Sequence, residues 1–211
     1  RMQSRPLVAG RVERLLSAQV SRSSVSDSRI RPTTPLGAIN GIPAWSPDGS
    51  RVLFNTMASL VPEDTNGGLD VYVKDVASGV ATLVNATASG TPSNDGAALI
   101  ENAWSPDGRR VIFYSAATNL VDGANTALGR FYIKDLESGS LSVVNRPADG
   151  DQSNIPDIQQ PWWSPDGNML MFLSGSTNIA TDGSQGFLFV LDLVSGTVRS
   201  IDANVSGGLP N

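Results

Sequence analysis

The side chains best suited to chemistry lie in one loop, Asp64-Thr65-Asn66-Gly67-Gly68-Leu69-Asp70. Asp64, Asn66 and Asp70 place oxygen atoms at intervals around a bend that two glycines allow. A hard cation such as calcium is bound by oxygen ligands arranged in this way. The loop therefore predicts a calcium site at Asp64, Asn66 and Asp70.

A structural turn is the competing interpretation of the same loop. The corresponding loop further along the chain has Ala124, Thr126 and Arg130 at the matching places, and an arginine there would oppose a cation. The motif also lacks the bidentate glutamate that ends an EF-hand loop. Calcium is thus the one cofactor that the sequence suggests, and both interpretations stay open.

Several other kinds of catalytic site are excluded by composition. The chain of 211 residues contains no Cys and no His, so it holds no cysteine nucleophile, disulfide, Ser-His-Asp triad or histidine-bound zinc. Nothing in the sequence forces two carboxylates close together, as a glycosidase would require. We therefore expect a protein that is not an enzyme.

The elements that position the loop follow a repeat. The pentapeptide Trp-Ser-Pro-Asp-Gly occurs at Trp45–Gly49, Trp104–Gly108 and Trp163–Gly167, with an interval of 59 residues each time. Pro, Asp and Gly favour a tight turn after the Trp. The identical place of the three Trp residues predicts that they pack between neighbouring repeats.

Each repeat has the pattern of four antiparallel strands. A short strand ends at the Trp, an apolar strand follows the turn, and a polar loop leads to a third strand that closes in a Ser-Gly turn. The apolar strands predict burial on both faces, and the polar fourth strands predict an outer edge. The expected first strands are Gly41 to Trp45, Glu101 to Trp104 and Gln160 to Trp163.

Four-stranded units at a near-fixed period predict an all-β fold, a β-propeller with three blades. The Trp-Ser-Pro-Asp-Gly turn, the apolar strand and the Tyr-Val-Lys-Asp strand with its Ser-Gly turn resemble the blade repeat of TolB-type propellers, over about residues 37–211. Among bacterial proteins the resemblance implies a periplasmic or extracellular location.

Three blades are fewer than the four to eight of most closed propellers. A fourth Trp motif would fall near residue 222 at the same interval, so the sequence ends just before it. Three explanations stay open: an oligomer in which two copies complete a six-bladed ring, a fragment of a longer propeller, or a larger assembly that covers the open blade faces.

Residues 1–36 differ from the repeats and predict a separate arm. Residues 1–31 contain seven arginines and two acidic residues, whereas the whole chain has a net charge of -5. The pattern of this segment predicts a mostly extended arm, with a short helix within Leu7 to Val20. The basic arm predicts docking to a partner through the first four arginines, Arg1, Arg5, Arg11 and Arg14.

These features together predict a non-catalytic protein-binding scaffold subunit that its basic arm docks into a larger, exported or membrane-associated assembly. Its partners would be other subunits, or a second copy that completes the propeller. The acidic body argues against nucleic acid as a partner. The alternative function is a calcium-stabilised propeller that binds a glycan or peptide beside an enzyme.

Overall fold

The computed structural model describes residues 43–122, 129–144 and 159–203. These residues form twelve strands, and no helix among them is long and apolar enough to cross a membrane. The predicted arm, with its arginines and its short helix, lies outside the described residues, and so does the boundary expected at residue 36. These expectations stay predictions.

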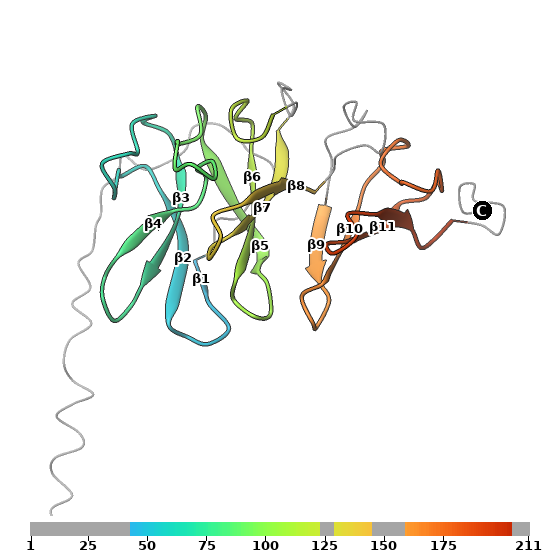
Figure 1. Cartoon of the computed structure of the whole chain (residues 1–211), viewed down its shortest axis with the longest axis horizontal. Coiled ribbons are helices and arrows are strands. Elements are labelled where there is room, and N and C mark those ends of the chain that lie inside the picture. Colours follow the sequence, from blue (N-terminus) through green and yellow to red (C-terminus); the bar gives the residue numbers. More distant parts are fainter. Residues whose placement is uncertain (1–42, 123–128, 145–158, 204–211) are drawn as a thin grey trace, which may run out of the picture. The chain divides into compact units, whose positions relative to one another are not determined.

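The strands form three separate four-stranded antiparallel sheets, which are the blades of a β-propeller fold (Figure 1). In every blade the strands are hydrogen-bonded in chain order. Blade 1 contains β1 (Ala44–Trp45), β2 (Arg51–Thr56), β3 (Asp70–Asp75) and β4 (Ala81–Leu83). Blade 2 contains β5 (Ala97–Trp104), β6 (Arg110–Ser115), β7 (Arg130–Asp135) and β8 (Leu141–Val143). Blade 3 contains β9 (Gln159–Trp163), β10 (Met169–Leu173), β11 (Leu188–Asp192) and β12 (Val198–Ser200).

The first strands differ most from their predicted bounds. Strand β5 begins at Ala97 rather than Glu101, and its register against β6 shifts between Leu99 and Trp104. Asn102, within this irregular stretch, has a φ of 55°. A bulge of this kind breaks the regular alternation on which a sequence pattern depends, so the sequence located only the end of the strand.

The Trp-Ser-Pro-Asp-Gly turns have the predicted geometry. In the first turn the Gly49 amide donates to the Ser46 carbonyl over 2.9 Å, and Gly49 takes a φ of 70°, which a glycine adopts at no steric cost. The Asp48 carboxylate accepts hydrogen bonds from the Ser46 hydroxyl and from the hydroxyl and amide of Ser50. These bonds lower the pKa of Asp48 well below its ordinary value.

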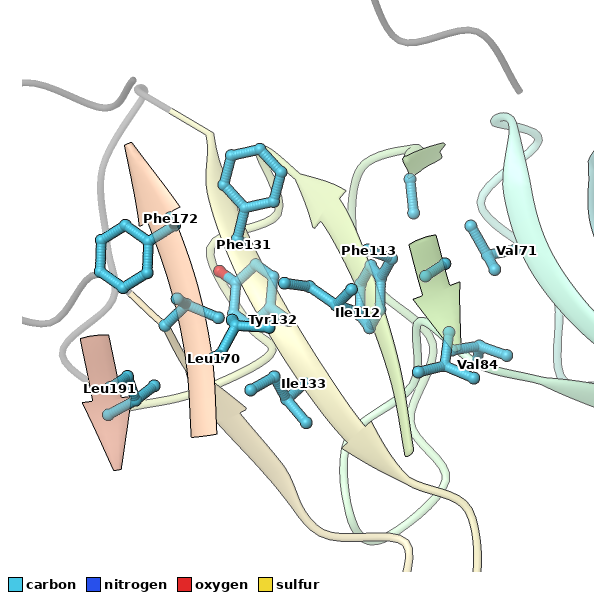
Figure 2. Close-up of a cluster of buried hydrophobic side chains, with 14 of the residues drawn as sticks. Val71, Val84, Ile112, Phe113, Phe131, Tyr132, Ile133, Leu170, Phe172 and Leu191 are labelled. Carbon is cyan, nitrogen blue, oxygen red and sulfur yellow. The ribbon is translucent and has the colours of Figure 1, made fainter. Parts of the chain in front are cut away.

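One apolar core runs through all three blades (Figure 2). Its fully buried members include Val71 and Val84 of blade 1, Ile112 and Phe113 of blade 2, and Phe172 of blade 3. Strand β5 packs against β2 and β3, and β9 packs against β5, so each blade buries one face on the next. Removing apolar surface from water at these junctions holds the blades together.

Burial on both faces, predicted for the apolar second strands, holds in the middle blade. In β6 the residues Val111, Ile112 and Phe113 are all buried. In β10, by contrast, Leu170 and Phe172 are buried while Met171 is half-buried. Blade 2 has a described blade on each side, whereas blade 3 has one on a single side.

Candidate functional site

Trp104 and Arg51 make hydrogen bonds and a cation–π contact across the junction of blades 1 and 2. The indole N–H of Trp104 donates to the Ala44 carbonyl over 3.2 Å. The Arg51 guanidinium lies over the Trp104 ring, 5.2 Å from its centre, and donates to the Gly108 carbonyl over 2.8 Å. Blade 1 thus supplies a cation and a carbonyl, and blade 2 supplies a ring, an N–H and a carbonyl.

A buried lysine adds further hydrogen bonds across this junction. Lys134 lies on β7, is 6% exposed, and donates from Nζ to the carbonyls of Ala86 (2.7 Å) and Thr87 (3.2 Å) in blade 1. Burial lowers the pKa of Lys134. A buried ammonium group needs such acceptors to offset its lost hydration, so Lys134 ties the two blades together.

The junction of blades 2 and 3 repeats part of this arrangement. Arg110 donates to the Gly167 carbonyl over 2.9 Å, as Arg51 does to Gly108. Among the described residues, however, the buried indole nitrogen of Trp163 has no hydrogen-bond partner. Leu191 takes the place of Lys134 on the third strand, so the lysine fastening is replaced by apolar packing.

The prediction that every repeated Trp packs between blades is wrong for Trp45. Trp104 is 9% exposed and Trp163 is partly buried, but Trp45 is 62% exposed. The Trp of each blade packs on the blade that precedes it. No described blade precedes blade 1, so the ring of Trp45 faces solvent.

This exposed side of blade 1 carries the same groups that blade 2 uses to hold blade 1. Trp45 corresponds to Trp104, Lys74 to Lys134, and Gly49 to Gly108 in the repeat. Lys74 is exposed, whereas Lys134 is buried. We call the surface formed by Trp45, Lys74 and Gly49 the open face; it offers two hydrogen-bond donors, one carbonyl and an aromatic ring.

The loop predicted to bind calcium lies at the start of β3 and contains two buried carboxylates. Asp64 is 6% exposed and Asp70 is fully buried. The Tyr72 hydroxyl donates to Oδ2 of Asp64, and the amide groups of Asn66 and Asn85 donate to Oδ1 of Asp70. The other oxygens, Asp64 Oδ1 and Asp70 Oδ2, are buried and receive no hydrogen bond from an N–H or O–H donor.

The two carboxylates influence one another electrostatically. Burial raises the pKa of Asp70, the hydrogen bonds from Asn66 and Asn85 oppose this, and both the charge of Asp64 and its side-chain contact with Asp70 raise it further. Burial also raises the pKa of Tyr72, to about 12, and its hydrogen bond to Asp64 adds to the shift. We call Asp64 and Asp70 the carboxylate pair.

Asn66 holds the loop around this pair. Its amide nitrogen donates to Asp70 (2.9 Å) and to the Ser93 carbonyl (3.0 Å), and its oxygen accepts from the Gly68 amide (2.6 Å). In this arrangement the Asn66 oxygen is used within the loop. The structure thus brings the three predicted ligands together, and their binding of a metal stays a prediction.

The matching position in blade 2 carries the opposite charge. Arg130 begins β7 where Asp70 begins β3, and it is buried, with 4% exposure. In blade 3 Phe187 stands at this position, just before β11, and is exposed. The carboxylate pair is therefore a feature of blade 1 and not of the repeat.

Within the described ranges no group of three or more His, Cys, Asp or Glu side chains could hold a metal ion. A site at the carboxylate pair would need amide, main-chain or water oxygens as its remaining ligands. The predicted partner-binding residues Arg1, Arg5, Arg11 and Arg14 lie outside the described residues.

No protein-family model matches this chain, and no curated protein does. Among solved structures, TolB from Acinetobacter baumannii is 19% identical with a TM-score of 0.44, over 76% of this chain and 32% of its own. The β-propeller domain of the trilobed protease from Pyrococcus furiosus is 15% identical with a TM-score of 0.42, over 74% of this chain and 40% of its own. An oligogalacturonate lyase in complex with manganese is 17% identical with a TM-score of 0.45, over 78% and 36%.

The chain thus spans about a third of the length of the TolB structure that it matches. At these identities the likeness concerns the fold alone, and the similar structures carry different names and activities. The assignment of this chain to the β-propeller fold rests on its own three four-stranded sheets. Its function has to be argued from its own residues.

Sequence reasoning missed the arginines that join the blades, although a signal for them exists. Arg51 and Arg110 each follow the turn glycine by two residues and are 59 residues apart, like the Trp motif. The lysine that contacts the neighbouring blade, Lys134, likewise recurs in the repeat, as Lys74. A polar residue that recurs with the repeat period is a candidate for the junction between repeats.

Proposed function

We propose that this chain is a non-catalytic protein-binding propeller subunit, and that the open face of blade 1 is its binding surface. One observation carries the proposal. The groups that fasten blade 2 to blade 1 recur on blade 1, where Trp45 is 62% exposed instead of 9% as at Trp104. These groups serve packing and hydrogen bonding, which supports binding rather than catalysis.

The partner that fits this surface has the groups of a propeller blade, and we propose that another subunit supplies it. By analogy with the junction of blades 1 and 2, it would offer a main-chain carbonyl to the Trp45 indole and further carbonyls to Lys74. It would also place an arginine over the Trp45 ring, within reach of the Gly49 carbonyl, as Arg51 does at Trp104 and Gly108.

A second copy of this chain fits the surface less well. In a head-to-tail contact, blade 3 of one copy would precede blade 1 of the next. The residue of blade 3 that corresponds to Arg51 is Met169, which can pack against a ring but cannot donate to the Gly49 carbonyl. We therefore favour a different subunit over self-association.

The basic arm supplies the second contact in this proposal. Arg1, Arg5, Arg11 and Arg14 would bind an acidic surface of the same assembly, for which the resemblance to TolB-type blades implies an exported location. If the arm docks the subunit, deletion of residues 1–36 weakens the binding of the partner. Unchanged binding after that deletion would contradict the role of the arm.

Whether another protein contacts the open face can be tested by incorporating a photo-crosslinking amino acid at position 45 in the cells that produce the protein. We expect a discrete crosslink to a blade-like segment of another protein, which is then purified. Its affinity for the chain should fall by about tenfold or more with Trp45→Ala, because a central aromatic anchor carries much of the energy of an interface. Val194→Ala is the control, since Val194 is 82% exposed on blade 3.

Three results would overturn the proposal. The first is a crosslink from position 45 to the same polypeptide, for example to residues 1–36, which would mean that the protein covers the face itself. The second is a crosslink to a second copy, with a native mass of twice 22.1 kDa. The third is an identified partner that binds the Trp45→Ala variant as tightly as the unmodified chain.

A further inference from the structure

The carboxylate pair of blade 1 buries negative charge, and the proposed role of the open face does not involve this pair. Asp64 and Asp70 are buried, and neither takes part in an ion pair within the part of the chain that the structure describes. Each also leaves one buried oxygen without an N–H or O–H donor, and the two carboxylates contact each other. A buried, unpaired carboxylate is strongly unfavourable unless a cation or a proton offsets it.

Asn66 and Asn85 lower the pKa of Asp70 through their hydrogen bonds, against burial and the contact with Asp64, which raise it. Tyr72 donates to Asp64, and Asn66 and Asn85 donate to Asp70, so each of these contacts uses a carboxylate oxygen as an acceptor. Hydrogen bonds that a carboxylate accepts favour its charged form. One shared proton would leave one negative charge buried, whereas a divalent cation would offset both.

We propose that Asp64 Oδ1 and Asp70 Oδ2 bind a calcium ion, which fixes the loop 64–70 at the start of β3. Calcium is bound by oxygen ligands in flexible geometry, so loop carbonyls and water can complete the shell. The Asn66 side chain, hydrogen-bonded to Asp70 and to Gly68, orients the loop around the ion. This site is independent of the open face and of the partner that binds there.

The neighbouring blade supports a positive charge at this place. Arg130 occupies in blade 2 the position that Asp70 occupies in blade 1, and it too is buried. Blade 2 therefore has a built-in cation there. Blade 1 has two carboxylates instead, and would obtain its positive charge from a bound ion.

Thermal melting of the whole chain, treated with a chelator and titrated with calcium, tests the site. We expect a saturable rise in melting temperature on the order of 5 to 10 °C at a hundredfold excess over Kd, because binding to the folded state alone stabilises it. Calorimetric titration should give one ion per chain. Magnesium and sodium, titrated separately, should give smaller shifts, since magnesium demands a near-ideal octahedral site.

Two variants locate the effect, and a third controls for it. Asp64→Asn and Asp70→Asn should abolish the calcium response. Because Asp70 also accepts two hydrogen bonds, its variant can lose stability for other reasons, and Asp64→Asn is the decisive one. Asp182→Asn should respond like the unmodified chain, since Asp182 lies in an exposed turn of blade 3, where it accepts a hydrogen bond from the Ser184 amide.

Terbium provides a readout that does not depend on stability. Tyr72 is hydrogen-bonded to Asp64, so light absorbed by its ring should sensitise the emission of a terbium ion held by the pair, and calcium should displace that ion. Saturable emission that Asp64→Asn abolishes supports the site. No calcium-dependent shift and no terbium emission, or an equal response in Asp64→Asn, would overturn it and indicate a shared proton instead.

Discussion

Replacing Arg51 by methionine tests whether the junction of blades 1 and 2 depends on its arginine. Methionine is the residue that blade 3 carries at the same position, Met169, and it keeps an unbranched apolar stem. The variant loses the stacking on Trp104 and the 2.8 Å hydrogen bond to the Gly108 carbonyl. Stacking of this kind contributes about 0.5 to 1 kcal/mol, and a hydrogen bond from a charged donor about 1.5 to 3 kcal/mol.

Arg51 is half-buried, so the lower end of these values applies, and we expect Arg51→Met to reduce the free energy of unfolding by about 2 kcal/mol. Urea unfolding followed by tryptophan fluorescence measures this loss, and in a chain of this length it corresponds to a fall in melting temperature of about 4 to 8 °C.

Arg109→Met is the matched control for this variant. Arg109 pairs with Glu137 over 2.7 Å, but the two side chains are 54% and 72% exposed, so the loss should stay within about 0.5 kcal/mol. A double-mutant cycle with Trp104→Leu isolates the stacking itself, with an expected coupling of about 0.5 to 1 kcal/mol. Equal effects of Arg51→Met and Arg109→Met would refute the assignment of Arg51 to the junction.

Two further predictions concern Lys134 and Tyr72. Lys134→Met should cost about 1 to 3 kcal/mol in urea unfolding, because it leaves two carbonyls of blade 1 without their donor, whereas Lys74→Met should stay within about 0.5 kcal/mol. Equal losses in the two lysine variants would count against this fastening. The pKa of Tyr72 is raised from 10.0 to about 12, so its contribution to stability is full below pH 10.0 and is lost as the pH rises through about 12. Melting temperatures across that window should fall less steeply in Tyr72→Phe, and an unchanged slope would contradict the raised pKa.

Most of the fold could be predicted from the sequence because turn motifs mark the ends of the strands in every repeat. The Trp-Ser-Pro-Asp-Gly turns and the Ser-Gly turns fix where strands end, and apolar runs such as Val111 to Phe113 fix which segments are buried. The start of β5 could not be predicted, because its bulge near Asn102 interrupts the alternation. The exposure of Trp45 was missed because a repeated motif does not show which neighbour a given copy has.

The candidate site was predictable in part. The spacing of Asp64, Asn66 and Asp70 correctly indicated that they lie together, since all three belong to one short loop. Asn85 and Tyr72, which also contact the pair, could not be found in this way. Tyr72 reaches it from the third strand and Asn85 from the segment just after the fourth, and only the pairing of strands brings them there.

Among the described residues, the junction of blades 2 and 3 has fewer polar contacts than the junction of blades 1 and 2. Between blades 1 and 2, an indole, a guanidinium and an ammonium group all donate to main-chain carbonyls across the junction. Between blades 2 and 3, Arg110 makes the corresponding bond, while Trp163 lacks a partner among the described residues and Leu191 replaces the lysine. In repeat proteins, stability is approximately the sum of the stability of each repeat and the energies of its junctions. In the part of the chain that the structure describes, apolar packing is therefore the larger part of the attachment of blade 3, whereas the open face of blade 1 keeps the full set of polar groups that a closely matched neighbour would use.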